Sequence, residues 1–277
     1  MIGQDKHTID EYVKAIGIIP AGVMVYTSIQ EVSGLTKAFS NGGGVHHGAY
    51  LMQRYPDSAL QIGLYMVDAL DKVNGGVYDL NIDKLADWIK LQQRPVYLRI
   101  GYEFDNPDNH YSPDKYIRAF KRIVKRFRTR DVNNVVFVWH SGAFRGGDRD
   151  PMSWFPGEEY VDWFAASLFA PVQYEQVSHL ASLSRLWGKP FMIAEASPMG
   201  TFILPVKKDW YDKFFRIIAR LEPQAVCYIN SNWDTLPMWK EMKFGDARVQ
   251  RYPEIKEMWL NEIRQERYIH AIEKLEK

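Results

Sequence analysis

The sequence contains little cysteine and no long apolar run. Cys227 is the only cysteine among the 277 residues, so the chain can form neither an intrachain disulfide nor a zinc site built on cysteines. No apolar stretch reaches the roughly 18 residues that a membrane-spanning helix needs, and the N-terminal MIGQDKHTID lacks the layout of a signal peptide. We therefore expect a soluble protein, either cytoplasmic or secreted with its signal already removed.

A strong charge of one sign is also missing. The 35 Lys and Arg residues are balanced by 34 Asp and Glu residues, so the formal net charge is only +1. Such a chain has no electrostatic attraction to nucleic acid or to an anionic membrane, and we expect neither as a partner. A neutral substrate suits this balance better.

Cofactor motifs are absent as well. The glycine-rich segment NGGGVHHGAY (residues 41–50) has neither the P-loop spacing nor the GxGxxG spacing with its downstream acidic residue, and it predicts a flexible rim loop. His46 and His47 are adjacent within it and would point apart on a helix, which makes them a poor pair of metal ligands. We expect no cofactor and no metal.

Aromatic residues, by contrast, are plentiful. They make up 14% of the sequence, with nine Trp and sixteen Tyr. In a sugar-binding site an aromatic ring covers the apolar C–H face of a pyranose while polar groups bind its hydroxyls. The composition therefore favours a carbohydrate ligand, and additional core packing is the alternative use of these rings.

Short apolar runs alternate with longer segments of helical period, which is typical of parallel βα units. The length matches the roughly 250 residues of one (β/α)8 TIM barrel, and no linker or repeat divides the chain. We predict a single α/β barrel domain over residues 1–277. Seven strands are predicted at residues 21–29, 59–67, 95–104, 134–141, 161–169, 189–197 and 225–233. Helices are predicted at residues 8–17, 81–93, 112–130, 178–188 and 209–222, and Ser112 with Pro113 is typical of a helix start.

The two ends of the chain carry further expectations. A helix at residues 8–17 precedes the strand at 21–29, so residues 1–5 are predicted to be a truncated first strand. A short first strand exposes ladder groups of its neighbours unless another segment or a partner chain covers them. The charged segment 260–277 has helical period and predicts a solvated closing helix or an oligomer contact. We expect a monomer or a weak homo-oligomer.

Two glutamates stand at predicted strand ends. Glu103 lies near the end of the fourth strand in LRIGYEFD, and Glu195 near the end of the seventh in FMIAEAS. The carboxyl ends of all barrel strands open on one face, so both side chains can point at a common centre. Retaining hydrolysis of a glycosidic bond needs two carboxyl groups about 5–5.5 Å apart. Arg99 is expected on the same side as Glu103, where it would hold the nucleophile ionised or form a buried ion pair.

Four segments resemble glycoside hydrolase family 26 and its relatives in clan A: PVYLRIGYEFD (95–105), NNVVFVWHSGAF (133–144), WFPGEEYVDWFAASLF (154–169) and GKPFMIAEASP (188–198). The resemblance implies Glu103 as acid/base and Glu195 as nucleophile, acting on β-linked mannan, glucan or xylan. This family usually has a histidine before the acid/base and a tyrosine at the end of strand six. Tyr102 and Phe169 stand there in this chain, so we expect another donor near the nucleophile or an unusual activity.

Further residues are predicted to bind the substrate. Trp233 at the end of the eighth strand is expected to be a stacking platform, and His140 is expected to reach a sugar hydroxyl or Glu103. Simple core packing is the alternative role for each. The other candidates at strand ends and in adjoining loops are Tyr26, Tyr65, Asp68, Arg99, Tyr102, Asp105 and Trp154.

Two other functions remain open at this point. One is a noncatalytic carbohydrate-binding barrel that has lost turnover, which Tyr102, Phe169 and the short first strand favour but the two retained glutamates oppose. The other is a metal-dependent hydrolase, which needs His and Asp at several strand ends. Only His140 is placed in that way.

Overall fold

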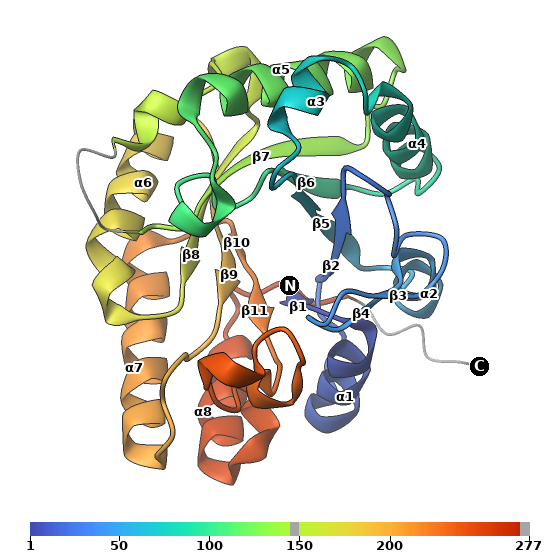
Figure 1. Cartoon of the computed structure of the whole chain (residues 1–277). Coiled ribbons are helices and arrows are strands. Elements are labelled where there is room, and N and C mark those ends of the chain that lie inside the picture. The colour runs from blue at the N-terminus through green and yellow to red at the C-terminus, as the bar shows by residue number, and fades with distance from the viewer. Residues whose placement is uncertain (145–149, 272–277) are drawn as a thin grey trace.

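The computed structural model describes residues 1–144 and 150–271, and its main sheet is a parallel barrel (Figure 1). The strands follow one another in the order β10-β9-β8-β7-β6-β5-β2-β1-β11. Their bounds are β1 Ile2–Gly3, β2 Gly22–Ser28, β5 Ala59–Tyr65, β6 Val96–Ile100, β7 Val135–Ser141, β8 Trp163–Leu168, β9 Phe191–Ala196, β10 Ala225–Val226 and β11 Tyr228–Ile229. A separate hairpin pairs β3 (Phe39–Ser40) with β4 (Val45–His46).

The eighth strand closes the barrel in two pieces. Cys227 separates β10 from β11, β10 pairs with β9, and β11 pairs with β1, so the two ends of the sheet meet. The short first strand β1 is present as predicted, with Ile2 opposite both Val23 and Tyr228. The predicted (β/α)8 barrel is therefore confirmed.

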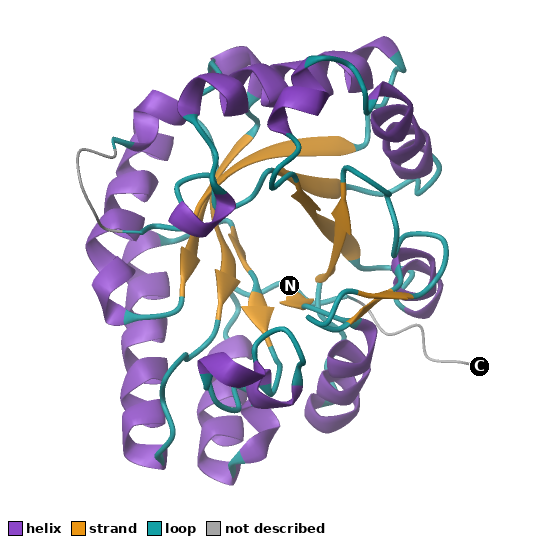
Figure 2. Ribbon diagram, viewed as in Figure 1, coloured by secondary structure: helices purple, strands orange, loops and turns teal. Residues whose placement is uncertain are grey.

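Helices surround the strands on the outside of the barrel (Figure 2). They are α1 Lys6–Ile16, α2 Gly48–Arg54, α3 Leu70–Asn74, α4 Asp79–Lys90, α5 Pro113–Thr129, α6 Tyr174–Leu186, α7 Leu204–Leu221 and α8 Pro253–Ile263. Helix α5 starts after Ser112 with Pro113 in its first turn, as the sequence predicted. Between β7 and β8 the described residues form only the 3-10 turns η2 (Pro151–Trp154) and η3 (Glu158–Tyr160). No helix in residues 1–144 and 150–271 is long and apolar enough to cross a membrane.

Strand alternation divides the buried side chains into two clusters. On β2, Val23 and Val25 pack in the cluster shared with the helices, whereas Met24 belongs to a second cluster inside the barrel. Gln61 is polar and fully buried inside the barrel, where its amide donates to the carbonyl of Ala194 at 3.0 Å. The interior cluster consists of Met24, Val138, Ala165, Met192, Ala194, Cys227, Ile229, Trp233 and Ala247.

The helix predicted for residues 260–277 is correct only as far as Ile263, and residues 264–271 are not helical. Helix α8 ends at Ile263, and the following chain turns back so that the amide of Ala271 donates to the carbonyl of Ile19 at 3.1 Å. The buried carboxylate of Glu262 holds this turn, because it accepts a hydrogen bond from the Tyr268 hydroxyl at 2.6 Å. Residues 272–277 lie outside the described residues.

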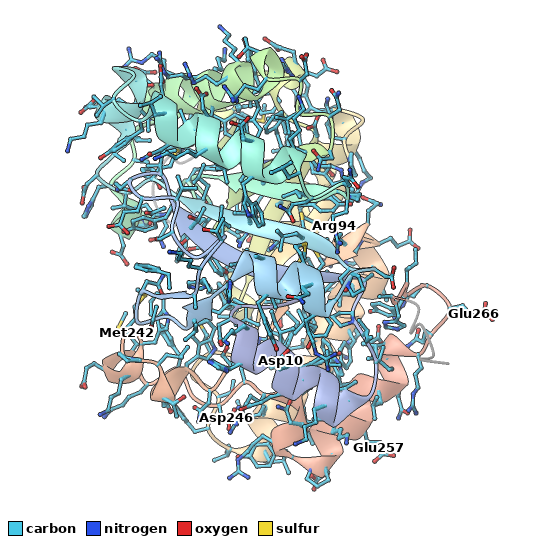
Figure 3. The ribbon with its side chains drawn as sticks, turned by 90° about the vertical axis from the view of Figure 1, so that its right-hand side faces the viewer. Asp10, Arg94, Met242, Asp246, Glu257 and Glu266 are labelled. Atoms are coloured by element: carbon cyan, nitrogen blue, oxygen red, sulfur yellow. The ribbon has the colours of Figure 1, made fainter. Side chains whose placement is uncertain are left out.

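Polar contacts fix the first two helices to each other. Asp10 on α1 accepts hydrogen bonds from the hydroxyls of Tyr50 and Tyr55, each at 2.6 Å. Arg94 lies before β6 and donates to the carbonyl of Tyr55 at 3.1 Å, on the side of the molecule that Figure 3 shows. These bonds hold α1, which follows the two-residue strand β1, against α2, and hold the end of α2 against the segment before β6.

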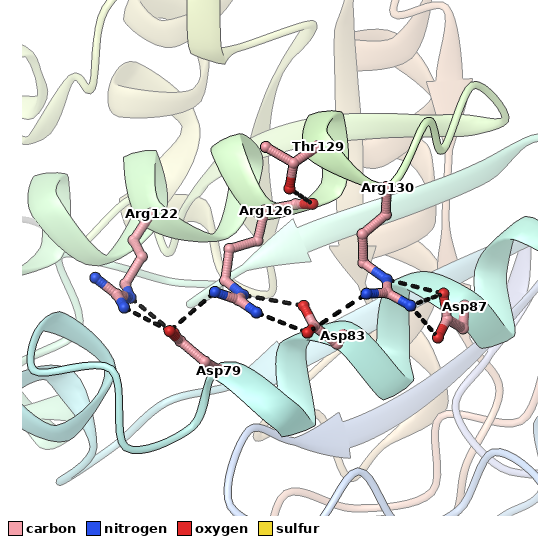
Figure 4. Close-up of polar contacts among 7 residues, drawn as sticks. All are labelled: Asp79, Asp83, Asp87, Arg122, Arg126, Thr129 and Arg130. Atoms are coloured by element: carbon pink, nitrogen blue, oxygen red, sulfur yellow. Dashed lines mark hydrogen bonds and ion pairs between the residues drawn. The ribbon is translucent and has the colours of Figure 1, made fainter.

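Helices α4 and α5 are joined by a ladder of ion pairs (Figure 4). Three aspartates of α4, and two arginines of α5 with a third at its C-cap, recur every fourth residue, so each set lies on one helix face. Arg126 bridges two rungs, donating to Asp79 at 2.9 Å and to Asp83 at 2.6 Å. The full ladder consists of Asp79, Asp83, Asp87, Arg122, Arg126 and Arg130.

We predict that Arg126→Ala lowers the free energy of unfolding by about 1 kcal/mol, because it removes a bidentate contact with Asp83 and a single contact with Asp79 from a partly exposed network. The loss should shrink in 1 M salt, which screens such pairs. Urea denaturation at low and high salt measures both values. Arg118→Ala, on an exposed position of the same helix outside the ladder, is the control. Its free energy of unfolding should stay within about 0.5 kcal/mol of the wild-type value. An equal effect of the two variants would contradict the prediction.

Candidate active site

Glu103 follows β6 in an unusual backbone conformation. Gly101 and Glu103 both have left-handed φ angles, 54° and 51°. For a residue other than glycine this conformation costs on the order of 1–3 kcal/mol and is typical of functional sites. The side chain of Asn109 holds the turn, donating to the carbonyls of Tyr102 at 3.2 Å and Glu103 at 2.9 Å. The turn places the carboxyl of Glu103 at the carboxyl end of the barrel strands.

Glu195 lies near the end of β9 and forms an ion pair with Arg99 of β6. Arg99 is fully buried, and the side chain of Glu195 keeps 8% of its surface exposed. The expected ion pair is therefore present, and it places a cation beside the carboxylate of Glu195. Arg99 itself has no exposed surface, so its expected contact with substrate is not supported by the structure.

The barrel register brings the two glutamates together. Ser167 on β8 is the strand partner of Glu195, after an irregularity that shifts the pairing between Ala166 and Ser167. The Ser167 hydroxyl donates to Glu103 Oε1 at 2.6 Å. Burial, and after it the nearby charge of Glu195, raise the pKa of Glu103 to about 7. One carboxyl group is thus protonated near neutral pH beside another that is ion-paired.

His140 lies between the arginine and the serine. Its ring is fully buried, with Nδ1 3.3 Å from Arg99 Nη1 and Nε2 3.0 Å from Ser167 Oγ. Burial and the charge of Arg99 lower the pKa of His140 well below its ordinary value, so the ring is neutral. The structure does not support an exposed contact with a sugar hydroxyl; His140 reaches Glu103 through Ser167.

Aromatic rings enclose the buried guanidinium. Tyr26 on β2, Gly63 on β5 and Arg99 on β6 are register partners across three adjacent strands. The guanidinium carbon of Arg99 lies 5.1 Å from the ring centres of both Tyr26 and Tyr102. A Cβ atom at Gly63 would lie 2.5 Å from Tyr26 and 2.9 Å from Arg99 Nη2. The glycine is therefore what allows the ring and the guanidinium to share this layer.

Tyr26 also provides a hydroxyl near the nucleophile candidate. Phe169, which follows β8, has no hydroxyl group. The Tyr26 hydroxyl is buried beside Arg99 and Glu195 without a well-aligned hydrogen bond to either. Burial and the charge of Glu195 raise the pKa of Tyr26, which keeps the hydroxyl protonated and able to donate.

The two predicted tryptophans lie in cores. Trp154 is 7% exposed and packs against Phe104 and Tyr116, with ring centres 5.6 and 5.8 Å apart. Trp233 is 2% exposed, and its indole N–H donates to Ser197 Oγ at 3.2 Å. The expectation that these rings contact sugar is not supported, because neighbouring side chains already cover them.

Asp105 is a structural residue in this site. It is buried, and its two oxygens accept from the hydroxyl of Ser141 at 2.7 Å and from the amide of Gly142 at 2.6 Å. It therefore fixes the end of β7 rather than facing a ligand. Tyr65 and Asp68 are exposed near the end of β5, and the Tyr65 ring centre lies 6.5 Å from that of Tyr102. Tyr102 is partly exposed as well, so these three remain candidates that a substrate can reach.

The rim loop is anchored to its surroundings. The carbonyl of Gly42 accepts from the amide of Met238 at 3.0 Å, and that of Gly43 accepts from the Gln4 side chain at 2.6 Å. Beside it lies a cleft of about 290 Å³ lined by Asp5, His7, Thr8, Ser40, Gly42, Gly44, Val45, Thr235, Leu236 and Pro237. No group of three or more His, Cys, Asp or Glu residues in the described part of the chain could hold a metal ion.

Ser167, Asn106 and Gly63 were missed by the sequence reasoning. Asn106 donates to Glu103 Oε2 at 3.2 Å. A polar residue in the otherwise apolar strand end FAASLF was the available signal for Ser167, and a glycine inside the strand ALQIGLY was the signal for Gly63. Nothing in the sequence marked Asn106.

A parallel barrel with a protonated glutamate beside an ion-paired one at its mouth has the architecture of a retaining barrel glycosidase. The chain belongs to glycosyl hydrolase family 26, because the sequence profile of that family matches residues 47–233. The family resemblance of the sequence motifs is thereby confirmed.

Two curated relatives align with nearly the whole chain. A Vibrio protein named beta-1,3-xylanase is 30% identical over 304 residues, covering 99% of this chain and 66% of the relative. An Alcaligenes protein of the same name is 29% identical, covering 97% of this chain and 64% of the relative. The chain thus spans just under two thirds of the length of these relatives.

Solved structures share the fold at lower identity. A family 26 β-mannanase from Bacteroides ovatus has a TM-score of 0.71 at 14% identity, covering 96% of this chain and 85% of that one. A modular endo-β-1,4-mannanase from Cellulomonas fimi has a TM-score of 0.69 at 15% identity, covering 98% of this chain and 72% of that one.

We predict that Glu103→Gln stabilises the protein at pH 8 but not at pH 4. Because the pKa of Glu103 is raised from 4.5 to about 7 in the folded chain, its contribution to stability is present below pH 4.5 and is lost as the pH rises through 7. The glutamine has no charge to bury, so the variant should gain ~2 kcal/mol over the wild type at pH 8. Urea denaturation at both pH values measures the gain. Glu241→Gln, at an exposed position, is the control, and a gain that does not depend on pH would contradict the prediction.

Proposed function

We propose that this chain hydrolyses β-1,3-linked xylan with retention of configuration, with Glu195 as nucleophile and Glu103 as acid/base. The observation that carries the substrate is the similarity at about 30% identity, over almost the whole chain, to two proteins named beta-1,3-xylanase. The mannanase structures resemble this chain at only 14–15% identity, which supports a common fold and says nothing of the substrate.

In the first step the carboxylate of Glu195 attacks the anomeric carbon, and the bond to the leaving oxygen breaks. Glu103 gives its proton to that oxygen, so a covalent glycosyl ester forms on Glu195 while Glu103 becomes ionised. In the second step Glu103 takes a proton from water, whose oxygen attacks the anomeric carbon and releases Glu195.

The surroundings of the two glutamates support these roles. Arg99 stabilises the negative charge that Glu195 must carry before it attacks. The pKa of about 7 leaves Glu103 protonated for the first step near neutral pH and able to lose its proton readily. Tyr65 is 40% exposed and offers a ring for a sugar face. The cleft beside the rim loop, with Thr8, Ser40 and Thr235 in its lining, offers hydroxyls for further sugar units.

A panel of polysaccharides tests the substrate. We expect xylooligosaccharides from β-1,3-xylan, and at least tenfold slower release from β-1,4-xylan, β-1,4-mannan and mixed-linkage β-glucan. Chromatography of the products measures the rates, and NMR of the first product shows its anomeric configuration. Preferred cleavage of mannan would refute the substrate, and binding of β-1,3-xylan without cleavage would refute the enzyme.

We predict different losses for the two glutamates. Glu195→Ala should lower kcat by about 10⁴-fold or more, since no covalent intermediate can form. Glu103→Ala should lower kcat by about 10²–10⁴-fold for glycosides with poor leaving groups, and far less for activated aryl glycosides, because only the former need a proton. Rates on a series of aryl xylosides and xylobiosides measure this dependence. Similar, mild losses in both variants would contradict the assignment.

A further inference from the structure

A hydrogen-bonded chain connects the two glutamates through the barrel interior. It runs from Glu195 to Arg99, then to His140, Ser167 and Glu103, across β9, β6, β7 and β8. All of its middle members are fully buried. Each of the adjacent strands β6, β7, β8 and β9 thus provides one member of these hydrogen bonds, and Glu103 follows β6, as the order of the strands in the sheet allows (Figure 1).

The donors and acceptors along these hydrogen bonds can be assigned in only one direction. A guanidinium has donors and no acceptor, so His140 Nδ1 must accept from Arg99 Nη1. The neutral ring therefore carries its proton on Nε2 and donates it to Ser167 Oγ at 3.0 Å. The serine hydroxyl is then left to donate to Glu103 Oε1 at 2.6 Å.

The other carboxyl oxygen has a weaker partner. Asn106 Oδ1 accepts from the amide of Asp108 at 3.0 Å, which orients the side-chain amide so that Nδ2 donates to Glu103 Oε2 at 3.2 Å. The short bond from Ser167 makes Oε1 the better-stabilised acceptor of the two. The transferable proton then belongs on Oε2.

We propose that Ser167 and His140 are positioning residues that fix the carboxyl group of Glu103, place its proton on Oε2 and stabilise the carboxylate that forms when this proton leaves. The proposal rests on the assignment of Glu103 as acid/base. Arg99 acts at both ends, since it pairs with Glu195 and also sets the tautomer of His140. Ser167 and His140 thereby connect the protonation of Glu103, through Arg99, to the ion pair of Glu195.

Charged groups on several elements act on Glu103. Glu195 on β9 and Asp105 in the same loop both raise the pKa of Glu103, while the bonds from Ser167 and Asn106 lower it. His140 on β7 is neutral and acts only through Ser167. Removal of the Ser167 hydroxyl should therefore move the pKa of Glu103 upward, with the two neighbouring carboxylates left in place.

The first experiment measures kcat/KM of Ser167→Ala against pH on a substrate with a poor leaving group. We expect the alkaline limb, where Glu103 loses its proton, to move up by about one pH unit, because a hydrogen bond to an ionised group is lost. We also expect kcat to fall about tenfold for poor leaving groups and to change less than twofold for activated aryl glycosides. Ser184→Ala removes a buried hydroxyl that bonds only within α6, and it should match the wild type throughout.

The second experiment tests whether His140 acts through Ser167. His140→Phe should shift the alkaline limb in the same direction as Ser167→Ala, and the double variant should shift it no further than Ser167→Ala alone. His140→Gln supplies one acceptor for Arg99 and one donor for Ser167, so it should restore at least half of the shift. Additive shifts in the double variant would overturn the role of His140.

A direct titration separates this inference from the proposed function. The carbon-13 signal of the Glu103 carboxyl, assigned by its loss in Glu103→Gln, reports the pKa with or without activity. A higher pKa in Ser167→Ala than in the wild type supports the inference, and equal values overturn it. Failure of the wild type to cleave any polysaccharide would instead refute the proposed function and leave this titration valid as a test of the positioning pair.

Discussion

The ion pair between Arg99 and Glu195 is the interaction on which the rest of the site depends. A fully buried guanidinium is costly to desolvate, so it needs a charged partner and polarisable neighbours. The barrel supplies those partners from different strands: a carboxylate from β9, a ring nitrogen from β7 and two aromatic faces at 5.1 Å. Gly63 leaves the space that this arrangement occupies.

The same arginine makes the surroundings of the two glutamates different. Glu195 has a cation beside it, whereas Glu103 has a serine, an amide and the negative charge of its neighbour. Burial and the charge of its neighbour favour the neutral form of Glu103, whereas Glu195 forms an ion pair with Arg99. Double displacement requires one carboxyl group that is protonated and one that is ionised, and the proposed roles of the two glutamates rest on this difference in their surroundings.

The departures from the usual family pattern have structural consequences at the same place. Tyr102 lies over Arg99 and stacks near His140, with ring centres 6.5 Å apart. Phe169 leaves the end of β8 without a hydroxyl, and Tyr26 brings one to the ion pair from the opposite side, on β2. The chain thus surrounds its candidate nucleophile with its own set of side chains, within a fold that it shares with the mannanase structures.

The sequence by itself determined the barrel and the order of its strands, and it singled out the two glutamates as candidates, because strand and helix periods are local and strand ends of a barrel share one face. It also indicated the Arg99 ion pair. Only the tertiary structure decided that Trp154 and Trp233 pack in cores, that Asp105 fixes the end of β7 and that Ser167 contacts Glu103. Those contacts depend on strand register, on the irregularity at Ser167 and on the left-handed turn at Glu103, and none of these leaves a local periodic signal.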